Sequence, residues 1–87
     1  MLELIYTAPF VRKLNALETA LQDEVIEKLE LFRDPKNHER LRLHKLHGEM
    51  KAYHSFSVNY TTRVIVRIVK KKAIAFMVDI GDHDIYQ

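Results

Sequence analysis

Apolar side chains in the first third of the chain recur at steps of three and four residues, the period of an amphipathic helix. Thr7 is a good N-cap, and Pro9 follows it in the first helical turn, where a missing N–H costs nothing. Pro35 ends the pattern, and a break is expected near residues 15–18. Residues 2–6 favour a short strand. We therefore predict a strand and a helical hairpin, whose apolar stripe consists of Phe10, Leu14, Leu17, Leu21, Val25, Leu29 and Phe32.

Beyond a polar connection the apolar period falls to two, which is typical of strands with one packed face. Three such stretches cover residues 52–58, 63–69 and 73–80, with turns at 59–61 and 70–72. The expected packed face consists of Phe56, Val58, Val64, Val66, Ile68, Ile74, Phe76, Val78 and Ile80. The expected opposite face consists of Tyr53, Ser55, Ser57, Arg63, Ile65 and Arg67. The pattern predicts an α+β fold, in which an N-terminal strand, a helical hairpin and a three-stranded antiparallel meander form one twisted sheet with one face partly open.

The register of the meander places charged groups side by side on the open face. If the first connection is a tight hairpin, Ser57 lies opposite Arg63 and Tyr53 lies opposite Arg67. The second turn then places Asp79 on the other side of Arg63. Arg63 would sit in the middle of the sheet between a hydroxyl and a carboxylate, an arrangement that a one-residue slip in either hairpin removes.

Composition narrows the class of protein. The 87 residues contain no cysteine, which excludes a disulfide-stapled scaffold, a cysteine-based zinc site and thiol chemistry. No apolar run approaches the 18 or so residues of a membrane helix, and the N-terminus lacks the basic region and cleavage site of a signal peptide. We therefore expect a single cytoplasmic domain over residues 1–87, without membrane contact.

The net charge of +2 hides a sharp partition along the chain. Residues 1–39 carry five Lys/Arg against eight Asp/Glu, and residues 73–87 carry three Asp and no base. The middle block, residues 40–72, carries nine Lys/Arg against one Glu, a net charge of +8. Such a basic band is the electrostatic footprint of a protein that binds phosphate or an acidic partner.

Three segments bring imidazole, guanidinium, ammonium and phenol groups to the same region. The pattern H-x-L-x-G-x-x-K-x-Y runs from His44 to Tyr53, and FSVNYTTRVIVRI follows it. The closing pattern D-I-G-D-H-D-I-Y runs from Asp79 to Tyr86. Together these groups can bind a phosphodiester and move its protons.

In these segments, and over essentially its whole length, the sequence resembles the RelE/ParE toxin superfamily. Within it, the sequence is most similar to the RelE-like mRNA interferases of the YafQ-like branch. The resemblance implies a small α+β toxin that enters the ribosomal A site and cleaves mRNA as an endoribonuclease. It also implies a cognate antitoxin encoded beside the toxin, which holds it inactive in a toxin–antitoxin hetero-oligomer.

The resemblance implies a metal-independent mechanism that needs no cofactor. A ribose 2′-hydroxyl can attack its own 3′-phosphate if its proton is removed, the developing charge is neutralised and the leaving 5′-oxygen is protonated. Arg63 matches the strand arginine that neutralises charge, and His44 and His83 match acid–base residues. The substrate-binding candidates are Lys45, Lys51, Tyr53, Arg67 and Tyr86.

The sequence departs from the YafQ-like pattern at three positions. Ser57 and Thr61 stand where that branch has a histidine and an aspartate, and Gln87 stands where it has an aromatic residue. These departures leave two alternatives open, a ParE-like inhibitor of DNA gyrase and a catalytically silent binding protein of the same fold. The pair His44 and His83 argues against the first, and Ser57 and Thr61 favour the second. A histidine zinc site is disfavoured because the spacing suits metal geometry poorly.

Overall fold

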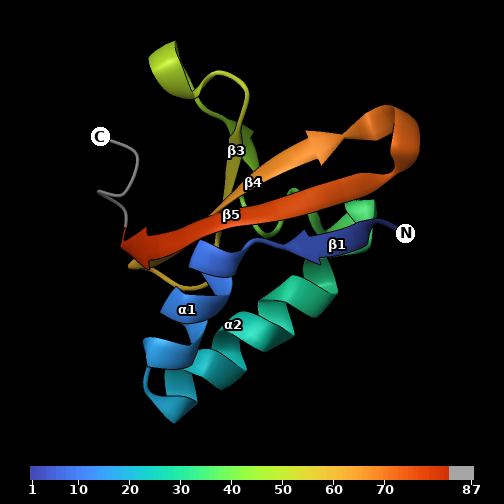
Figure 1. Ribbon diagram of the computed structural model, residues 1–87. Helices are drawn as coiled ribbons and strands as arrows, with labels where there is room; N and C mark the ends of the chain where they lie inside the picture. Colours follow the sequence, from blue (N-terminus) through green and yellow to red (C-terminus); the bar gives the residue numbers. More distant parts are fainter. Residues whose placement is uncertain (83–87) are drawn as a thin grey trace.

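The structure is a computed structural model that describes residues 1–82. The elements follow the predicted order, with one strand more than expected (Figure 1). They are β1 (Glu3–Tyr6), α1 (Ala8–Ala16), α2 (Thr19–Phe32), β2 (His44–Lys45), β3 (His54–Ser57), β4 (Thr62–Val69) and β5 (Ile74–Asp82), with 3-10 turns at Pro35–Asn37, Gly48–Met50 and Lys70–Lys72. The extra strand is β2, which lies in the segment that we expected to be a polar connection.

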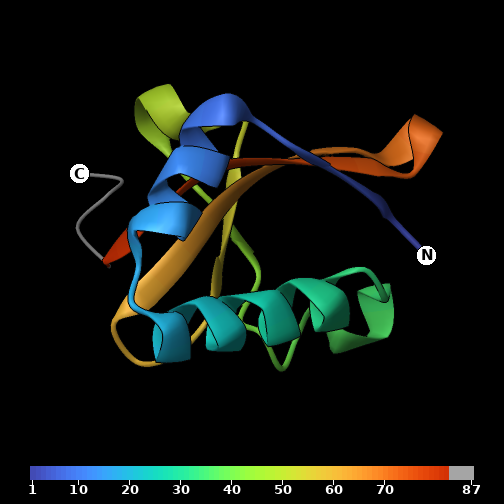
Figure 2. The same cartoon turned by 60° about the horizontal axis from the view of Figure 1, so that its bottom comes forward.

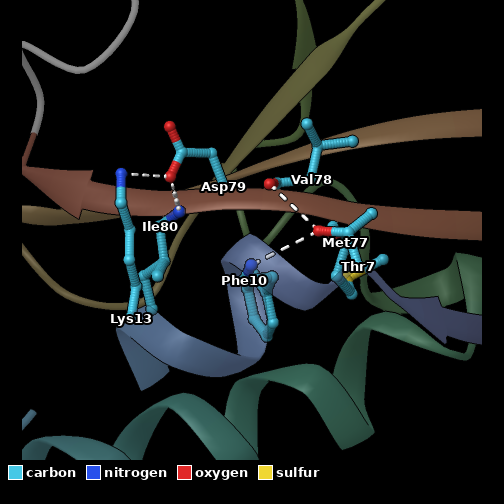
Figure 3. Close-up of polar contacts among 7 residues, drawn as sticks. All are labelled: Thr7, Phe10, Lys13, Met77, Val78, Asp79 and Ile80. Atoms are coloured by element: carbon cyan, nitrogen blue, oxygen red, sulfur yellow. Dashed lines mark hydrogen bonds and ion pairs between the residues drawn. The ribbon is translucent and has the colours of Figure 1, made fainter. Parts of the chain in front are cut away.

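The helical hairpin forms where the sequence predicts it. The Thr7 hydroxyl accepts a hydrogen bond from the backbone N–H of Phe10 and donates one to the carbonyl of Met77, at 3.3 and 2.9 Å (Figure 3). This one side chain therefore caps α1 and ties its first turn to β5. Between the helices, the Gln22 amide donates to the carbonyl of Leu14 at 2.9 Å, which satisfies a group at the end of α1.

The strands form one five-stranded sheet in the order β1-β5-β4-β3-β2. The β3–β4 and β4–β5 pairs are the predicted antiparallel meander, and β2 adds an antiparallel edge. On the other side, β1 pairs parallel with β5. Both helices lie against the same face of the sheet (Figures 1 and 2). The packed face and the open face of the prediction are thus both present. No helix among residues 1–82 is long and apolar enough to cross a membrane.

The hydrophobic core fills the space between the helices and the sheet. Phe32 stacks on Phe56 with ring centroids 4.6 Å apart, and His38 stacks on the other side of Phe32. Aromatic stacking of this kind adds to the gain from burying the rings. The buried members of this core are Leu2, Phe10, Val25, Leu29, Phe32, Leu41, Phe56, Val58, Val64, Val66, Ala75, Met77 and Ile80.

The predicted packed face of β5 is wrong for most of its length. Asp79 pairs with Ile65, but the next pair joins Met77 to Val66, so Val78 is an extra residue on β5. This β-bulge shifts the alternation by one residue. The buried residues are accordingly Ala75, Met77 and Ile80, whereas the predicted Ile74, Phe76 and Val78 are only partly buried.

Two residues at the centre of the open face, Ser55 and Ile65, are buried. Ser55 and Ile65 are opposite each other in the ladder, and their exposed fractions are 0% and 2%. Both residues were expected on the open face, and both were expected to be accessible there. The accessible part of this face is therefore a polar rim around a buried centre.

Ala73 should be a point of stored backbone strain. It has φ 53° and ψ 44°, in the left-handed region, at the turn between β4 and β5. Ala73→Gly should raise the free energy of unfolding by about 0.5–1 kcal/mol, because glycine adopts this conformation without the steric cost that alanine has. Urea denaturation measures the change. Ala16→Gly, at the end of α1 where φ is not positive, is the control and should not raise stability; a loss of stability in Ala73→Gly would contradict the strain.

Candidate functional site

The strand register brings His44 and Arg63 to the same face. His44 pairs with Ser55, which pairs with Ile65. Ser57, two residues after Ser55 on β3, pairs with Arg63. Residues directly opposite each other in a sheet project to the same side. His44 and Arg63 are two strands and two residues apart, so their Cα atoms are separated by about 12 Å.

Arg63 binds the hairpin between β3 and β4. Its Nη1 donates to the carbonyls of Asn59, Tyr60 and Thr62 at 2.8, 3.1 and 3.3 Å. The predicted pairing with Ser57 is confirmed. All three bonds come from one nitrogen, and the other guanidinium nitrogens carry further donors. Arg63 therefore has a structural role that the sequence did not indicate.

Asp79 does not flank Arg63, and that prediction is wrong. The residue opposite Arg63 on β5 is Gly81, and Asp79 lies opposite Ile65. The carboxylate of Asp79 instead binds Lys13 of α1 at 2.6 Å (Figure 3). The predicted β4–β5 register is wrong because the turn at Lys70–Lys72 and the bulge together shift it by two residues.

His44 is exposed at the edge of the sheet and has a defined tautomer. Its Nδ1 lies 3.0 Å from the carbonyl oxygen of Arg42. A carbonyl only accepts hydrogen bonds, so Nδ1 is the protonated nitrogen and Nε2 is the basic one in the neutral ring.

The remaining candidates are distributed around the rim. Lys45 pairs with His54, whose row faces the helices, so Lys45 is not beside His44 on the open face. Lys51 and Arg67 are exposed. The β3–β4 ladder starts at His54, one residue after Tyr53, so the predicted pair of Tyr53 with Arg67 lies beyond it.

Two of the positions that depart from the YafQ-like pattern lie in or beside the hairpin. Ser57 is half-buried opposite Arg63. Thr61 is exposed, and its backbone N–H and hydroxyl bind the Asn59 side chain at 2.9 and 3.2 Å. Both hydroxyls therefore stand near Arg63, but neither group titrates near neutral pH. His83 and Tyr86, like Gln87, lie outside the described residues.

A second cationic site, which the sequence argument missed, lies at the hairpin end of the sheet. We define the basic groove as the cavity of about 350 Å³ lined by Lys28, Arg40, Leu41, Arg42, Ser57, Val58, Asn59, Tyr60 and Arg63. The segment 40–42 runs beside β3, where the Ser57 N–H donates to the carbonyl of Leu41 at 2.8 Å. The alternation R-L-R-L at residues 40–43 is the sequence signal that could have indicated it.

His54 faces the helices, as its position in the alternation predicts. It lines a cavity of about 440 Å³ together with His38, Leu43, Ile68 and Lys70, among others. Burial lowers the pKa of His54, and the positive charges of Lys45 and Lys70 lower it further, with smaller effects of His44 and His38.

Acid should therefore destabilise the fold through His54. Because its pKa is lowered in the folded state, the unfolded chain binds more protons below about pH 6.5, and stability is lost as the pH falls through that value. We expect His54→Asn to flatten the fall in melting temperature between pH 7.5 and pH 5. Parallel curves for the parent and the variant would contradict this assignment.

Within residues 1–82, no group of three or more His, Asp or Glu side chains is placed to hold a metal ion.

Comparison with solved structures identifies the fold. The toxin–antitoxin complex RelBE2 from Mycobacterium tuberculosis matches with a TM-score of 0.78 at 20% identity, over 94% of this chain and 91% of that one. The archaeal RelE–RelB complex from Pyrococcus horikoshii matches with a TM-score of 0.75 at 17% identity, over 97% of each chain. YafQ from Escherichia coli matches with a TM-score of 0.76 at 13% identity, over 95% of this chain and 94% of that one.

No protein-family model and no curated protein matches the sequence. The likeness is thus one of structure at low identity, and it covers nearly the whole of each chain. The chain has the RelE-like toxin fold. This confirms the predicted fold class, and it agrees with the resemblance found in the sequence.

Proposed function

We propose that this chain is the toxin of a type II toxin–antitoxin system and acts as a ribosome-dependent endoribonuclease on mRNA. The observation that supports it best is the placement of His44 and Arg63 on the same face of a RelE-like sheet, on the side away from the helices. An exposed imidazole and an oriented guanidinium supply two of the three functions that cleavage requires. His83 is proposed for the third function, the second proton transfer.

In the proposed reaction, a ribose 2′-oxygen attacks the adjacent phosphorus and the bond to the 5′-oxygen breaks. One histidine takes the 2′-hydroxyl proton and the other protonates the leaving 5′-oxygen, which gives a cyclic phosphate and a free 5′-hydroxyl. Arg63 stabilises the extra negative charge that develops on the phosphate oxygens. Either histidine can serve as the base in this scheme, and the other then serves as the acid.

The other proposed contacts hold the substrate. Lys51 and Arg67 are exposed and can pair with flanking phosphates, and Lys45 can do so from the edge of the sheet. Tyr53 and Tyr86 offer rings for stacking on bases. Ser57 and Thr61 contribute hydroxyls in place of titrating groups, so we expect a slower cleavage step than in a site with both.

The test is controlled expression in bacterial cells, followed by mapping of mRNA 5′ ends and of gyrase cleavage complexes in the same culture. The proposal expects new mRNA ends within translated frames and no gyrase complexes. Gyrase complexes without mRNA cutting would replace it with the ParE-like alternative. Growth arrest with neither signal would support a silent binding protein.

We also propose that a cognate antitoxin covers part of this surface and forms a hetero-oligomer with the chain. Tyr6, Val11 and Ile26 are large apolar side chains that remain exposed on and beside the helices. The basic band of residues 40–72 offers charge to an acidic segment. Two of the similar structures are toxin–antitoxin complexes. Co-expression with each neighbouring small reading frame, followed by a pull-down, identifies the antitoxin; no binding by any neighbour would remove the two-component proposal.

A further inference from the structure

We propose that the basic groove binds the sugar–phosphate backbone of single-stranded RNA, and that Tyr60 stacks on a base of the same strand. The inference rests on the proposed function for the kind of ligand, but it concerns a surface beyond the row of His44, Ser55 and Ile65 on the open face. Its own residues are Lys28, Arg40, Arg42 and Tyr60.

The charge of the groove favours an anion. Four of its nine lining residues are cationic, namely Lys28, Arg40, Arg42 and Arg63, and none of the nine is acidic. The two acidic side chains nearby on α2 already have partners. Glu24 accepts a hydrogen bond from the Asn59 amide at 2.7 Å. Glu27 lies 3.5 Å from the Lys28 ammonium and offsets part of its charge, so Arg40, Arg42 and Arg63 supply the net positive charge of the groove.

The backbone at Arg42 is an independent observation. Arg42 has φ 58°, and it is one of two non-glycine residues with positive φ in the described part of the chain. Glycine or asparagine is the usual choice where a helical turn ends in this conformation. An arginine is therefore held where the backbone favours glycine, and its side chain lines the groove. Residues held in sparsely populated backbone conformations cluster at functional sites.

Hydrogen bonds hold the backbone of the groove against the sheet. The Leu41 carbonyl accepts the Ser57 N–H, which fixes segment 40–42 along β3. On the opposite wall, Asn59 Oδ1 accepts the backbone N–H groups of Thr61 and Thr62 at 2.9 and 2.8 Å. Cations on fixed backbone lose less freedom when they bind a phosphate.

Tyr60 and Arg63 indicate a nucleic acid strand as the occupant. Tyr60 is 91% exposed at the tip of the hairpin, where its ring packs on little of the protein. Base stacking on such a ring, beside cations that follow a backbone, is the usual way in which proteins hold single strands. Arg63 belongs both to the groove and to the open face. One strand of RNA can therefore run from the reacting position through Arg63 into the groove.

Binding of an RNA that cannot react separates this site from catalysis. The probe is a fluorescent single-stranded RNA of about ten nucleotides with 2′-O-methyl groups, which removes the attacking hydroxyl. Its dissociation constant is measured by anisotropy at several salt concentrations, with the full chain. The test variant is Arg40→Ala with Arg42→Gly. The matched control is Lys71→Ala with Lys72→Ala, which removes the same charge from an exposed turn outside the groove.

The groove variant should bind about 20-fold more weakly at 0.1 M salt, and its log–log salt slope should be smaller by about 1.4, because two phosphate contacts to a single strand are lost. The control should lose no more than about twofold and should keep the slope. The groove variant should melt no lower than the parent, since glycine relieves the left-handed position.

Tyr60 gives a second and charge-neutral measurement. Tyr60→Ala should weaken binding by about 5- to 100-fold, whereas Tyr60→Phe should retain it, because stacking needs the ring and not the hydroxyl. Neither variant should change the melting temperature, since the ring is almost fully exposed.

The outcomes distinguish the groove from the proposed function. Equal binding by the groove variant and the lysine control would overturn the groove, even if the parent cleaves mRNA. If the parent does not cleave mRNA but the groove still binds RNA, the groove inference is supported and the nuclease proposal is wrong. Preferential binding of an acidic peptide or of duplex DNA in the same assay would replace RNA as the occupant and overturn the inference.

Discussion

Replacing either His44 or His83 by glutamine should slow single-turnover cleavage of mRNA on programmed ribosomes by about 10²- to 10⁴-fold. General acid–base catalysis contributes rate factors of this size, and glutamine keeps the size and polarity of the side chain without a titrating nitrogen. The two losses should also change different limbs of the pH–rate profile, because the proposed mechanism uses one histidine as the base and the other as the acid.

The control is His47→Gln, which changes an exposed histidine in the same basic segment. It should cleave at the parental rate. All three variants should keep their melting temperature and still bind the antitoxin, since His44 and His47 lie outside the hydrophobic core and antitoxin binding covers a wide surface. Parental cleavage by folded His44→Gln and His83→Gln variants would show that the proton-transfer assignment is wrong.

The helices were predictable because their signals are local. The Thr7 cap, the break before α2 and the stop before Pro35 each depend on a few adjacent residues, and each is confirmed. The strand β2 carries no such signal. Two residues, His44 and Lys45, become a strand only because β3 offers them an edge to pair with, which is a tertiary effect.

The register was predictable only where a tight turn determines it. The Asn59 side chain closes the β3–β4 hairpin, and the predicted pair of Ser57 with Arg63 follows. The longer turn before Ala73 and the bulge at Val78 have no comparable sequence signal. Each additional residue shifts every later pair, so the sequence pattern places Asp79 opposite Arg63, whereas it pairs with Ile65.

The candidate site also has a part that could be predicted from the sequence and a part that could not. Alternation alone assigns Arg63 to the open face, and the structure places it there. His44 joins that face only through the pairing of β2 with β3, which the sequence did not indicate. The basic groove could not be assigned, because Lys28 comes from α2 and segment 40–42 from an irregular connection. These cations come together only because α2 packs against the hairpin, and the periodicity of the sequence does not predict that contact.

Arg63→Ala should reduce cleavage by about 100-fold or more, because it removes a donor that stabilises charge only in the transition state. The same change should lower the free energy of unfolding by about 1–2 kcal/mol, since the Nη1 bonds to the carbonyls of Asn59, Tyr60 and Thr62 are lost from a partly exposed position. Single-turnover cleavage and urea denaturation measure the two effects separately. Lys72→Ala controls for the loss of one positive charge.

A matched variant separates the charge of Arg63 from its support of the hairpin. Asn59→Ala removes the side chain that closes the same turn at Thr61 and Thr62, but it leaves the guanidinium in place. It should therefore lose a similar amount of stability and keep cleavage within about 10-fold of the parent. Arg63→Lys should recover part of the rate, because it restores a positive charge without the planar fork of donors. If Asn59→Ala cleaves as slowly as Arg63→Ala, the arginine acts by positioning the hairpin, and the charge that stabilises the transition state must come from another cation of the basic band.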